Sequence, residues 1–129
     1  MILVAAGLIY RDGKLLITQR PPGKHGALKW EFPGGKVESE EDPRDALTRE
    51  VREELGVEIT VHEIVETIFH RYSERTVLLL FYKCHWLSGE PETDDCNSFA
   101  WAGPSHLAGY DFLEADLGLI RKIEKGTEF

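Results

Sequence analysis

The sequence has few of the features that define several large classes of protein. Among 129 residues it has two cysteines, one methionine and only 15 lysines and arginines, against 23 aspartates and glutamates. Cys84 and Cys96 are too few for a disulfide framework or a structural zinc site, so we expect reduced thiols in a cytoplasmic protein. No apolar run reaches the roughly 18 residues of a membrane span. The first ten residues lack the basic start and the small-residue cleavage site of a signal peptide.

The shortage of positive charge also limits the partners. A net charge of −8 argues against binding to duplex nucleic acid or to an anionic membrane, because both require a positive surface. With 42% hydrophobic and 10% aromatic residues, the chain can still build a core. No repeat or linker interrupts it. We therefore predict one domain over residues 1–129, acting as a monomer or a homodimer.

The order of the elements predicts a mixed β-sheet with a helix on either side. Apolar and β-branched runs predict strands over residues 2–10 and 14–19, joined by a turn. The nearly continuous apolar run over 76–87 predicts a central strand covered on both faces. Shorter strands are predicted over 30–32, 57–61, 63–70 and 98–102. The segments 57–61 and 63–70 form either two strands or one bent strand.

Two helices are predicted. For the first, Asp42 is a capping residue, Pro43 suits the first helical position and Gly56 is a typical end. Its apolar stripe recurs every fourth residue, at Leu47, Val51 and Leu55. The second helix is predicted over 113–125, with three residues pointing inward: Leu117, Ile120 and Ile123.

The negative charge is concentrated around the first helix. Nine acids and three arginines between Glu38 and Glu58 leave a charge of −6 in 21 residues. Three carboxylates fall within an arc of about 100° beside the apolar stripe, those of Glu50, Glu53 and Glu54. They repel one another, and Arg49 cannot neutralise all three. Carboxylate oxygens suit Mg²⁺ or Mn²⁺, so a divalent cation would offset this charge; the alternative is a solvated helical face with salt bridges.

A glycine pair, Gly34-Gly35, precedes this helix. Glycine lets bare backbone approach a ligand, although the pair could equally form a tight turn. Its spacing does not match a Walker A loop.

Together these residues resemble the Nudix hydrolase signature, G-x5-E-x7-R-E-U-x-E-E-x-G-U, where U is a bulky aliphatic residue. Every specified position is matched, by Gly35, Glu41, Arg49, Glu50, Val51, Glu53, Glu54, Gly56 and Val57. The resemblance implies an α/β fold, the Nudix α/β/α sandwich with a central mixed β-sheet. It also implies Mg²⁺-dependent hydrolysis of a nucleoside diphosphate linked to another group. The implied metal ligands are Glu50, Glu53, Glu54 and a backbone carbonyl of Gly34-Gly35, supported by Arg49 and Glu41.

Residues 18–56 look most like the MutT-type enzymes, which remove oxidised nucleoside triphosphates. This resemblance implies nucleotide contacts from Arg20, His25, Arg75 and the segment Glu31-Phe32-Pro33-Gly34, whose phenylalanine packs on the base. Taken alone, Arg20 could be a strand-end charge, His25 a solvated loop residue and Phe32 a core residue. The acidic loop supplies a further catalytic carboxylate, for which Asp95 is preferred and Asp94 is nearly as good.

Base selection depends on Asp116. The MutT-type enzymes have an asparagine at this place, before the last helix. An ionised carboxylate accepts hydrogen bonds but cannot donate them, so it suits an exocyclic amine of cytosine, adenine or guanine. It could read 8-oxoguanine only through N–H donors, or if a raised pKa left it protonated. A related group that acts on cytidine triphosphates resembles this variant, and a helix cap is the alternative role.

We therefore predict an Mg²⁺-dependent enzyme that hydrolyses oxidised or modified nucleoside triphosphates to the monophosphate and pyrophosphate. Mn²⁺ is a possible substitute. The alternatives are a pyrophosphohydrolase for cytidine triphosphates and a non-catalytic module that senses nucleotides. With metal bound, the acidic stretch would receive a polyphosphate despite the net charge.

Overall fold

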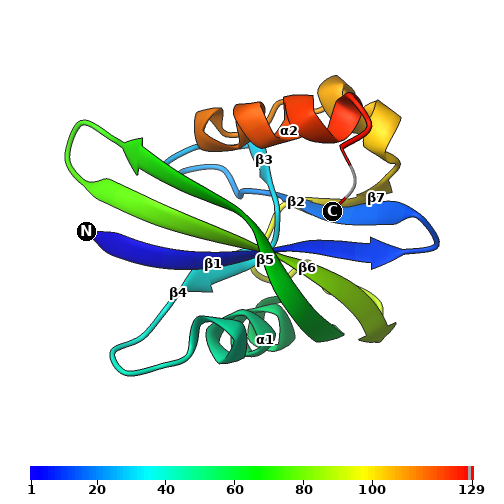
Figure 1. Ribbon diagram of the computed structural model, residues 1–129, viewed down its shortest axis with the longest axis horizontal. Helices are drawn as coiled ribbons and strands as arrows, with labels where there is room; N and C mark the ends of the chain where they lie inside the picture. Colours follow the sequence, from blue (N-terminus) through cyan, green and yellow to red (C-terminus); the bar gives the residue numbers. More distant parts are fainter. Residues whose placement is uncertain (128) are drawn as a thin grey trace.

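In the computed structural model, which describes residues 1–127 and 129, a seven-stranded mixed sheet lies between two helical layers (Figure 1). The strands are β1 (Ile2–Arg11), β2 (Lys14–Gln19), β3 (Trp30–Glu31), β4 (Gly34–Lys36), β5 (Glu58–Arg71), β6 (Thr76–Ser88) and β7 (Ser98–Ala102). Helix α1 (Pro43–Leu55) covers one face. The other face is covered by α2 (Leu117–Glu124), which follows two short 3-10 helices, η1 (Pro104–Gly109) and η2 (Glu114–Asp116). The predicted mixed sheet with a helix on either side is confirmed.

The centre of the sheet is the parallel pair β1 and β6. The strands follow the order β3-β2-β1-β6-β5, with β4 paired to β1 and β7 paired to β2. Successive side chains of a strand point to opposite faces, so both central strands contribute to two cores. Leu8 and Phe81 pack in the core under α2, whereas Ile9 and Tyr82 pack in the core under α1. The central strand predicted over 76–87 is thus buried on both faces, as its apolar composition requires.

Helix α1 begins and ends where the sequence predicts. The Asp42 side chain accepts a hydrogen bond of 2.8 Å from the backbone N–H of Arg44, and Gly56 ends the helix in the left-handed conformation, with φ of 68°. The predicted apolar stripe is buried against the sheet. Because this face is fixed, the carboxylates beside it are held at the edge of the sheet.

The last helix differs from the prediction over 113–125. It opens with the 3-10 helix η2, and the α-helix begins only at Leu117. A 3-10 turn has three residues instead of 3.6, which changes the direction of the following side chains. Leu117, predicted to point inward, is 40% exposed, and Leu119 is buried in its place beside Ile120 and Ile123.

Two further segments settle alternatives that the sequence leaves open. Gly34-Gly35 is not a tight turn but lies in β4, paired with Ala6 and Ala5 of β1. The segments predicted over 57–61 and 63–70 fall in one strand, β5 (Glu58–Arg71), whose register against β6 shifts around Ile64. Among the described residues, no helix is long and apolar enough to cross a membrane.

Candidate active site

A cleft of about 490 Å³ opens where the C-terminal half of α1 faces β4, the loop after β2, the β5–β6 turn and the segment before α2. Most of the residues that the sequence proposes for function line it, namely Arg20, His25, Glu31, Phe32, Pro33, Gly34, Gly35, Glu50, Glu54, Arg75, Asp95 and Asp116. Glu53 lines an adjoining hollow that shares Glu50, Glu54 and Asp95 with the cleft. The fold therefore brings together segments that are separate in the sequence.

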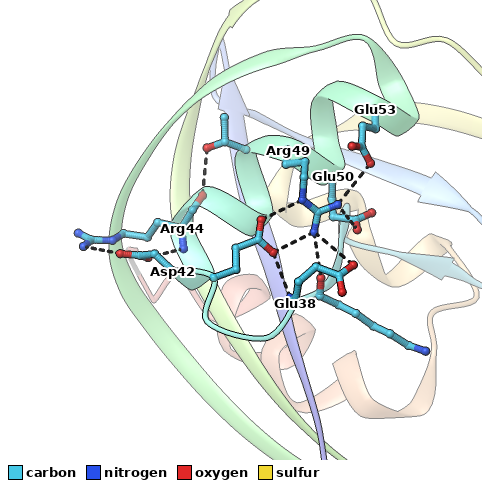
Figure 2. Close-up of polar contacts among 9 residues, drawn as sticks. Glu38, Asp42, Arg44, Arg49, Glu50 and Glu53 are labelled. Carbon is cyan, nitrogen blue, oxygen red and sulfur yellow. Dashed lines mark hydrogen bonds and ion pairs between the residues drawn. The ribbon is translucent and has the colours of Figure 1, made fainter.

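Arg49 does not line the cleft but donates hydrogen bonds to several acids at its acidic end (Figure 2). Its guanidinium donates to Glu41 at 2.9 and 3.0 Å, to Glu50 at 3.0 Å and to Glu53 at 3.3 Å. It also donates to the backbone carbonyl of Lys36 at 3.3 Å. The hydrogen bonds to Glu41 raise the pKa of Arg49 above its usual range and lower the pKa of Glu41. Arg49 thus fixes the direction of Glu50 but has no donor left for Glu54.

The two glycines are required by close packing. A Cβ on Gly34 would overlap the carbonyl oxygen of Ala5, and a Cβ on Gly35 would overlap the carboxylate of Glu50. The side chain of Glu50, only 15% exposed, therefore lies directly over the bare backbone of β4. This approach puts carboxylate oxygens beside backbone groups, which is an arrangement suited to a hard cation.

The acidic wall of the cleft, formed by Glu50, Glu54 and Asp95, carries more negative charge than neighbouring cations compensate, and the pKa of Glu54 reflects this excess. Although part of its side chain reaches solvent, burial raises its pKa to about 8, together with a hydrogen bond to Glu50 and the charges of Glu50, Glu31 and Asp95. Neighbouring carboxylates that lack enough positive charge around them favour the binding of either a proton or a cation. The donor set therefore fits a divalent cation with oxygen ligands.

The acids are not yet gathered around one point. Among residues 1–127 and 129, no three His, Cys, Asp or Glu side chains are arranged to hold a metal ion. Glu53 is 60% exposed and turned toward Arg49. Enclosing an ion with Glu50, Glu53 and Glu54 thus requires Glu53 to change its rotamer.

At the other end of the cleft, Asp116 is buried without a partner. Asp116 is only 5% exposed. Within the described chain its side chain makes no hydrogen bond or ion pair, and it does not cap the first N–H groups of α2. The capping alternative is therefore wrong. Burial, with the nearby charge of Glu31, raises the pKa of Asp116 to about 8. In its protonated form this carboxyl group can donate as well as accept a hydrogen bond.

Arg20 is the centre of the adjacent polar contacts. Its Nη1 donates to both carboxylate oxygens of Glu31, at 3.2 and 3.3 Å, and its Nε donates to the carbonyl of His25 at 2.8 Å. Burial outweighs this ion pair and raises the pKa of Glu31. Arg20 is therefore more than a strand-end charge, because it ties the loop over 21–29 to β3.

Phe32 belongs to the core and also reaches the cleft. It is 4% exposed, with its ring 5.5 Å from Phe112 and 6.2 Å from Phe81, centroid to centroid. Of the two loop acids, Asp95 lines both the cleft and the adjoining hollow, whereas Asp94 lines only the hollow. Geometry thus favours Asp95, as the sequence does.

Sequence reasoning missed several lining residues. Thr18, Lys24, Tyr72 and Cys96 face the cleft but belong to no motif. Thr18 is a buried polar residue in an otherwise apolar strand, which is a detectable signal. Tyr72 and Lys24 lie in a turn and a loop, where only the fold shows which way a side chain points.

A glycine-rich strand, an acidic helix and basic residues around one cleft define a hydrolase that acts on phosphate anhydrides. The family model of the NUDIX domain matches residues 4–122, so the chain belongs to the Nudix family. It is a Nudix pyrophosphohydrolase of the MutT type. Members of this family generally need a divalent metal.

Three similar proteins span nearly the whole chain. The CTP pyrophosphohydrolase of Escherichia coli K12 is 40% identical over 120 residues, covering 93% of this chain and 89% of that one. The 8-oxo-dGTP diphosphatase of the same strain is 31% identical over 123 residues, covering 95% of each. The solution structure of the E. coli ORF135 protein is similar with a TM-score of 0.80 at 40% identity, covering 94% of this chain and 86% of that one.

Proposed function

We propose that this enzyme hydrolyses nucleoside triphosphates to a nucleoside monophosphate and pyrophosphate, in the manner of MutT-like removal of oxidised or modified nucleotides. The observation that carries the proposal is the distribution of groups in the cleft. Carboxylates gather at one end, whereas Asp116 and the cationic side chains lie at the other. Such a cleft, with a cation bound, has one end for a polyphosphate and one for a base.

The proposed metal is Mg²⁺, with Mn²⁺ as a substitute. Glu50, Glu53, Glu54 and a carbonyl of Gly34-Gly35 would hold it, and Asp95 supplies a further carboxylate nearby. When bound, such an ion neutralises phosphate oxygens and lowers the pKa of its water. The chain's own contribution is to position these groups: Arg49 orients Glu50, as its hydrogen bond of 3.0 Å supports.

The substrate would be held by the remaining lining residues. Arg20, Lys24, His25 and Arg75 offer cationic or N–H groups to phosphate and sugar, and Phe32 offers an apolar surface to the base. Glu31, Pro33 and Gly34 complete this wall. The protonated carboxyl of Asp116 presents a donor beside an acceptor.

That pair of groups supports two kinds of base. Cytosine presents its N3 acceptor beside the N4 amine, and 8-oxoguanine presents its O6 acceptor beside N7–H. The names of the relatives favour the same two possibilities, since one acts on CTP and the other on 8-oxo-dGTP. We therefore keep cytidine triphosphates as the second candidate substrates.

The remaining proposals concern the state of the enzyme. The cleft is built from segments between Val4 and Asp116, which supports a single domain over 1–129. We propose that it acts as a monomer or a homodimer. The free cysteines Cys84 and Cys96 support a reducing, cytoplasmic compartment. The charge of −8 argues against duplex nucleic acid or a membrane as the partner, and it does not argue against a small nucleotide received by a bound cation.

A pyrophosphate-release assay tests the function. Purified protein is given a panel of normal, oxidised and methylated nucleoside triphosphates with Mg²⁺, Mn²⁺ or EDTA. We expect metal-dependent release of pyrophosphate and a monophosphate from at least one triphosphate. Absence of turnover across the whole panel would refute the proposal.

The same panel tests Asp116 as the base reader. Asp116→Asn keeps a donor and an acceptor but fixes which atom does which, so we expect the ratio of rates on dCTP and 8-oxo-dGTP to change severalfold. An unchanged ratio would remove Asp116 from base recognition.

A further inference from the structure

Tyr72 follows β5 at the start of the turn to β6 and lies between two histidine rings. Its ring centroid is 5.3 Å from that of His25, with planes at 88°, and 4.5 Å from that of His70, with planes at 68°. Edge-to-face contacts of this kind are favourable and directional. We name the three residues His25, Tyr72 and His70 the aromatic bridge.

The aromatic bridge joins two parts of the fold that the sheet keeps apart. His25 lies in the loop between β2 and β3, whereas His70 and Tyr72 lie at the end of β5 and in the turn to β6. In the sheet, β2 and β3 are on one side of β1, and β6 and β5 are on the other. The bridge therefore spans the cleft from one side to the other, and both His25 and Tyr72 line it.

Two members of the bridge, His25 and Tyr72, are each tied to an arginine of the cleft. The carbonyl of His25 accepts a hydrogen bond of 2.8 Å from Arg20 Nε. The backbone N–H of Tyr72 donates to the carbonyl of Arg75 at 2.8 Å, which closes the turn. Fixing the distance between His25 and Tyr72 thus also limits the separation of Arg20 and Arg75.

The hydroxyl end of Tyr72 lies among the substrate-facing groups. Burial raises its pKa, as does the charge of Asp116, while the charges of Arg20 and Arg75 lower it. The phenol thus has an electrostatic environment set by the cleft rather than by bulk solvent.

We infer that Tyr72 is a positioning residue, which through the aromatic bridge holds Arg20 and Arg75 across the cleft so that both contact one nucleotide. This inference rests on the proposed function. A preformed pair of cationic contacts lowers the cost of ordering two loops when substrate binds. The bridge acts on binding and leaves the acidic end of the cleft unchanged.

The decisive variant is Tyr72→Leu, which removes both ring contacts, compared with Tyr72→Phe, which keeps them. With the best substrate of the panel, we expect Tyr72→Leu to raise KM about tenfold with kcat within about twofold. Tyr72→Phe should restore KM to within about threefold of the original value. Phe69→Leu, which changes an exposed aromatic residue on β5, is the matched control and should leave both constants unchanged. An unchanged KM in Tyr72→Leu would overturn the inference.

Two measurements without turnover separate this inference from the proposed function. In NMR spectra, the Tyr72 ring should shift the ring protons of His25, so these resonances should move in Tyr72→Leu and stay in Tyr72→Phe. Calorimetry with CMP and 8-oxo-dGMP should show about tenfold weaker binding by Tyr72→Leu. If the wild-type protein hydrolyses triphosphates but the His25 resonances or the binding do not change, the bridge is refuted and the function stands.

If instead no triphosphate is hydrolysed, the function fails and these two measurements still decide whether the bridge positions a nucleotide. His70→Leu guards against misfolding of Tyr72→Leu, because it removes one contact and leaves Tyr72 in place. We expect it to raise KM about threefold. The same KM as wild type in His70→Leu, with a misfolded Tyr72→Leu, would also count against the inference.

Discussion

The acidic wall of the cleft, around Arg49, and the neighbouring Arg52–Glu58 pair are built from the same residue types and behave differently. On one side, Arg52 forms a bidentate ion pair with Glu58, with two bonds of 2.8 Å, so one cation meets one anion. On the other side, Arg49 is shared by Glu41, Glu50 and Glu53, and Glu54 has no arginine at all. The hydrogen bonds from Arg52 lower the pKa of Glu58, whereas burial, together with a hydrogen bond to Glu50 and the neighbouring carboxylates, raises the pKa of Glu54 to about 8. Charge left uncompensated in a cleft, rather than charge itself, marks the side that is built for a ligand.

The largest expected effect is on turnover. Glu54→Gln removes a carboxylate from the acidic wall, and we expect kcat to fall by a factor on the order of 10² to 10³. Glu53→Gln should behave similarly if Glu53 turns toward the ion. Glu58→Gln, in the Arg52–Glu58 pair, should keep kcat within about twofold. Equal losses in Glu54→Gln and Glu58→Gln would mean that the two sides do not differ.

A smaller loss of turnover is expected when a side chain is placed on Gly35, against the Glu50 carboxylate. Gly35→Ala places a methyl group where the Glu50 carboxylate lies, so Glu50 must move, and we expect kcat to fall about 10- to 100-fold. Gly118→Ala is the control, because nothing lies within 4 Å of a Cβ at that position. It should keep full activity. Turnover of Gly35→Ala equal to that of Gly118→Ala would show that the position of Glu50 is not critical.

Replacing each arginine by lysine compares the two sides directly. Lysine keeps the charge but cannot reach several carboxylates at once, so Arg49→Lys should lower kcat about tenfold. Arg52→Lys should leave kcat and KM unchanged, because its single partner lies away from the cleft. Steady-state kinetics on both variants measure the difference. A fully active Arg49→Lys enzyme would remove the orienting role of Arg49.

The smallest expected effect is on stability, and it distinguishes an acid whose pKa is raised, Asp116, from one whose pKa is lowered, Glu58. Asp116 has a folded pKa of about 8, raised from 3.8, so its contribution to stability is present at acid pH and is lost as the pH rises toward 8. Glu58, whose pKa is lowered, contributes above its unfolded pKa and loses this contribution as the pH falls. Melting temperatures of metal-free protein between about pH 3 and 8.5 check both contributions. Asp116→Asn should gain several degrees over wild type at the alkaline end, and a constant difference across the range would contradict the shift.

Much of the fold and part of the site follow from local patterns. The cap at Asp42, the end at Gly56 and the apolar stripe of α1 depend on residues within one or two helical turns, and they are found as predicted. The end of the chain shows the limit of this approach. Leu117 was placed inward because the 3.6-residue period was assumed from residue 113, and the 3-10 turn before it changed the phase.

The site shows the same division. Nine signature positions at fixed spacing locate the acidic end, because the helix holds its three glutamates, Glu50, Glu53 and Glu54, within one arc. Asp116 and Tyr72 are different. The raised pKa of Asp116 depends on its burial and on Glu31, which is 85 positions earlier in the chain, and Tyr72 belongs to no sequence motif.

By itself, the sequence determined the family signature, the helix that carries it and the local excess of negative charge, because all three are set by residues close together along the chain. Only the tertiary structure decided which acids stay uncompensated, which aspartate of the loop faces the cleft, that the pKa of Asp116 is raised and that Tyr72 packs against His25. Burial and contact between distant segments set these properties, since a pKa or a ring contact depends on what surrounds a side chain in space.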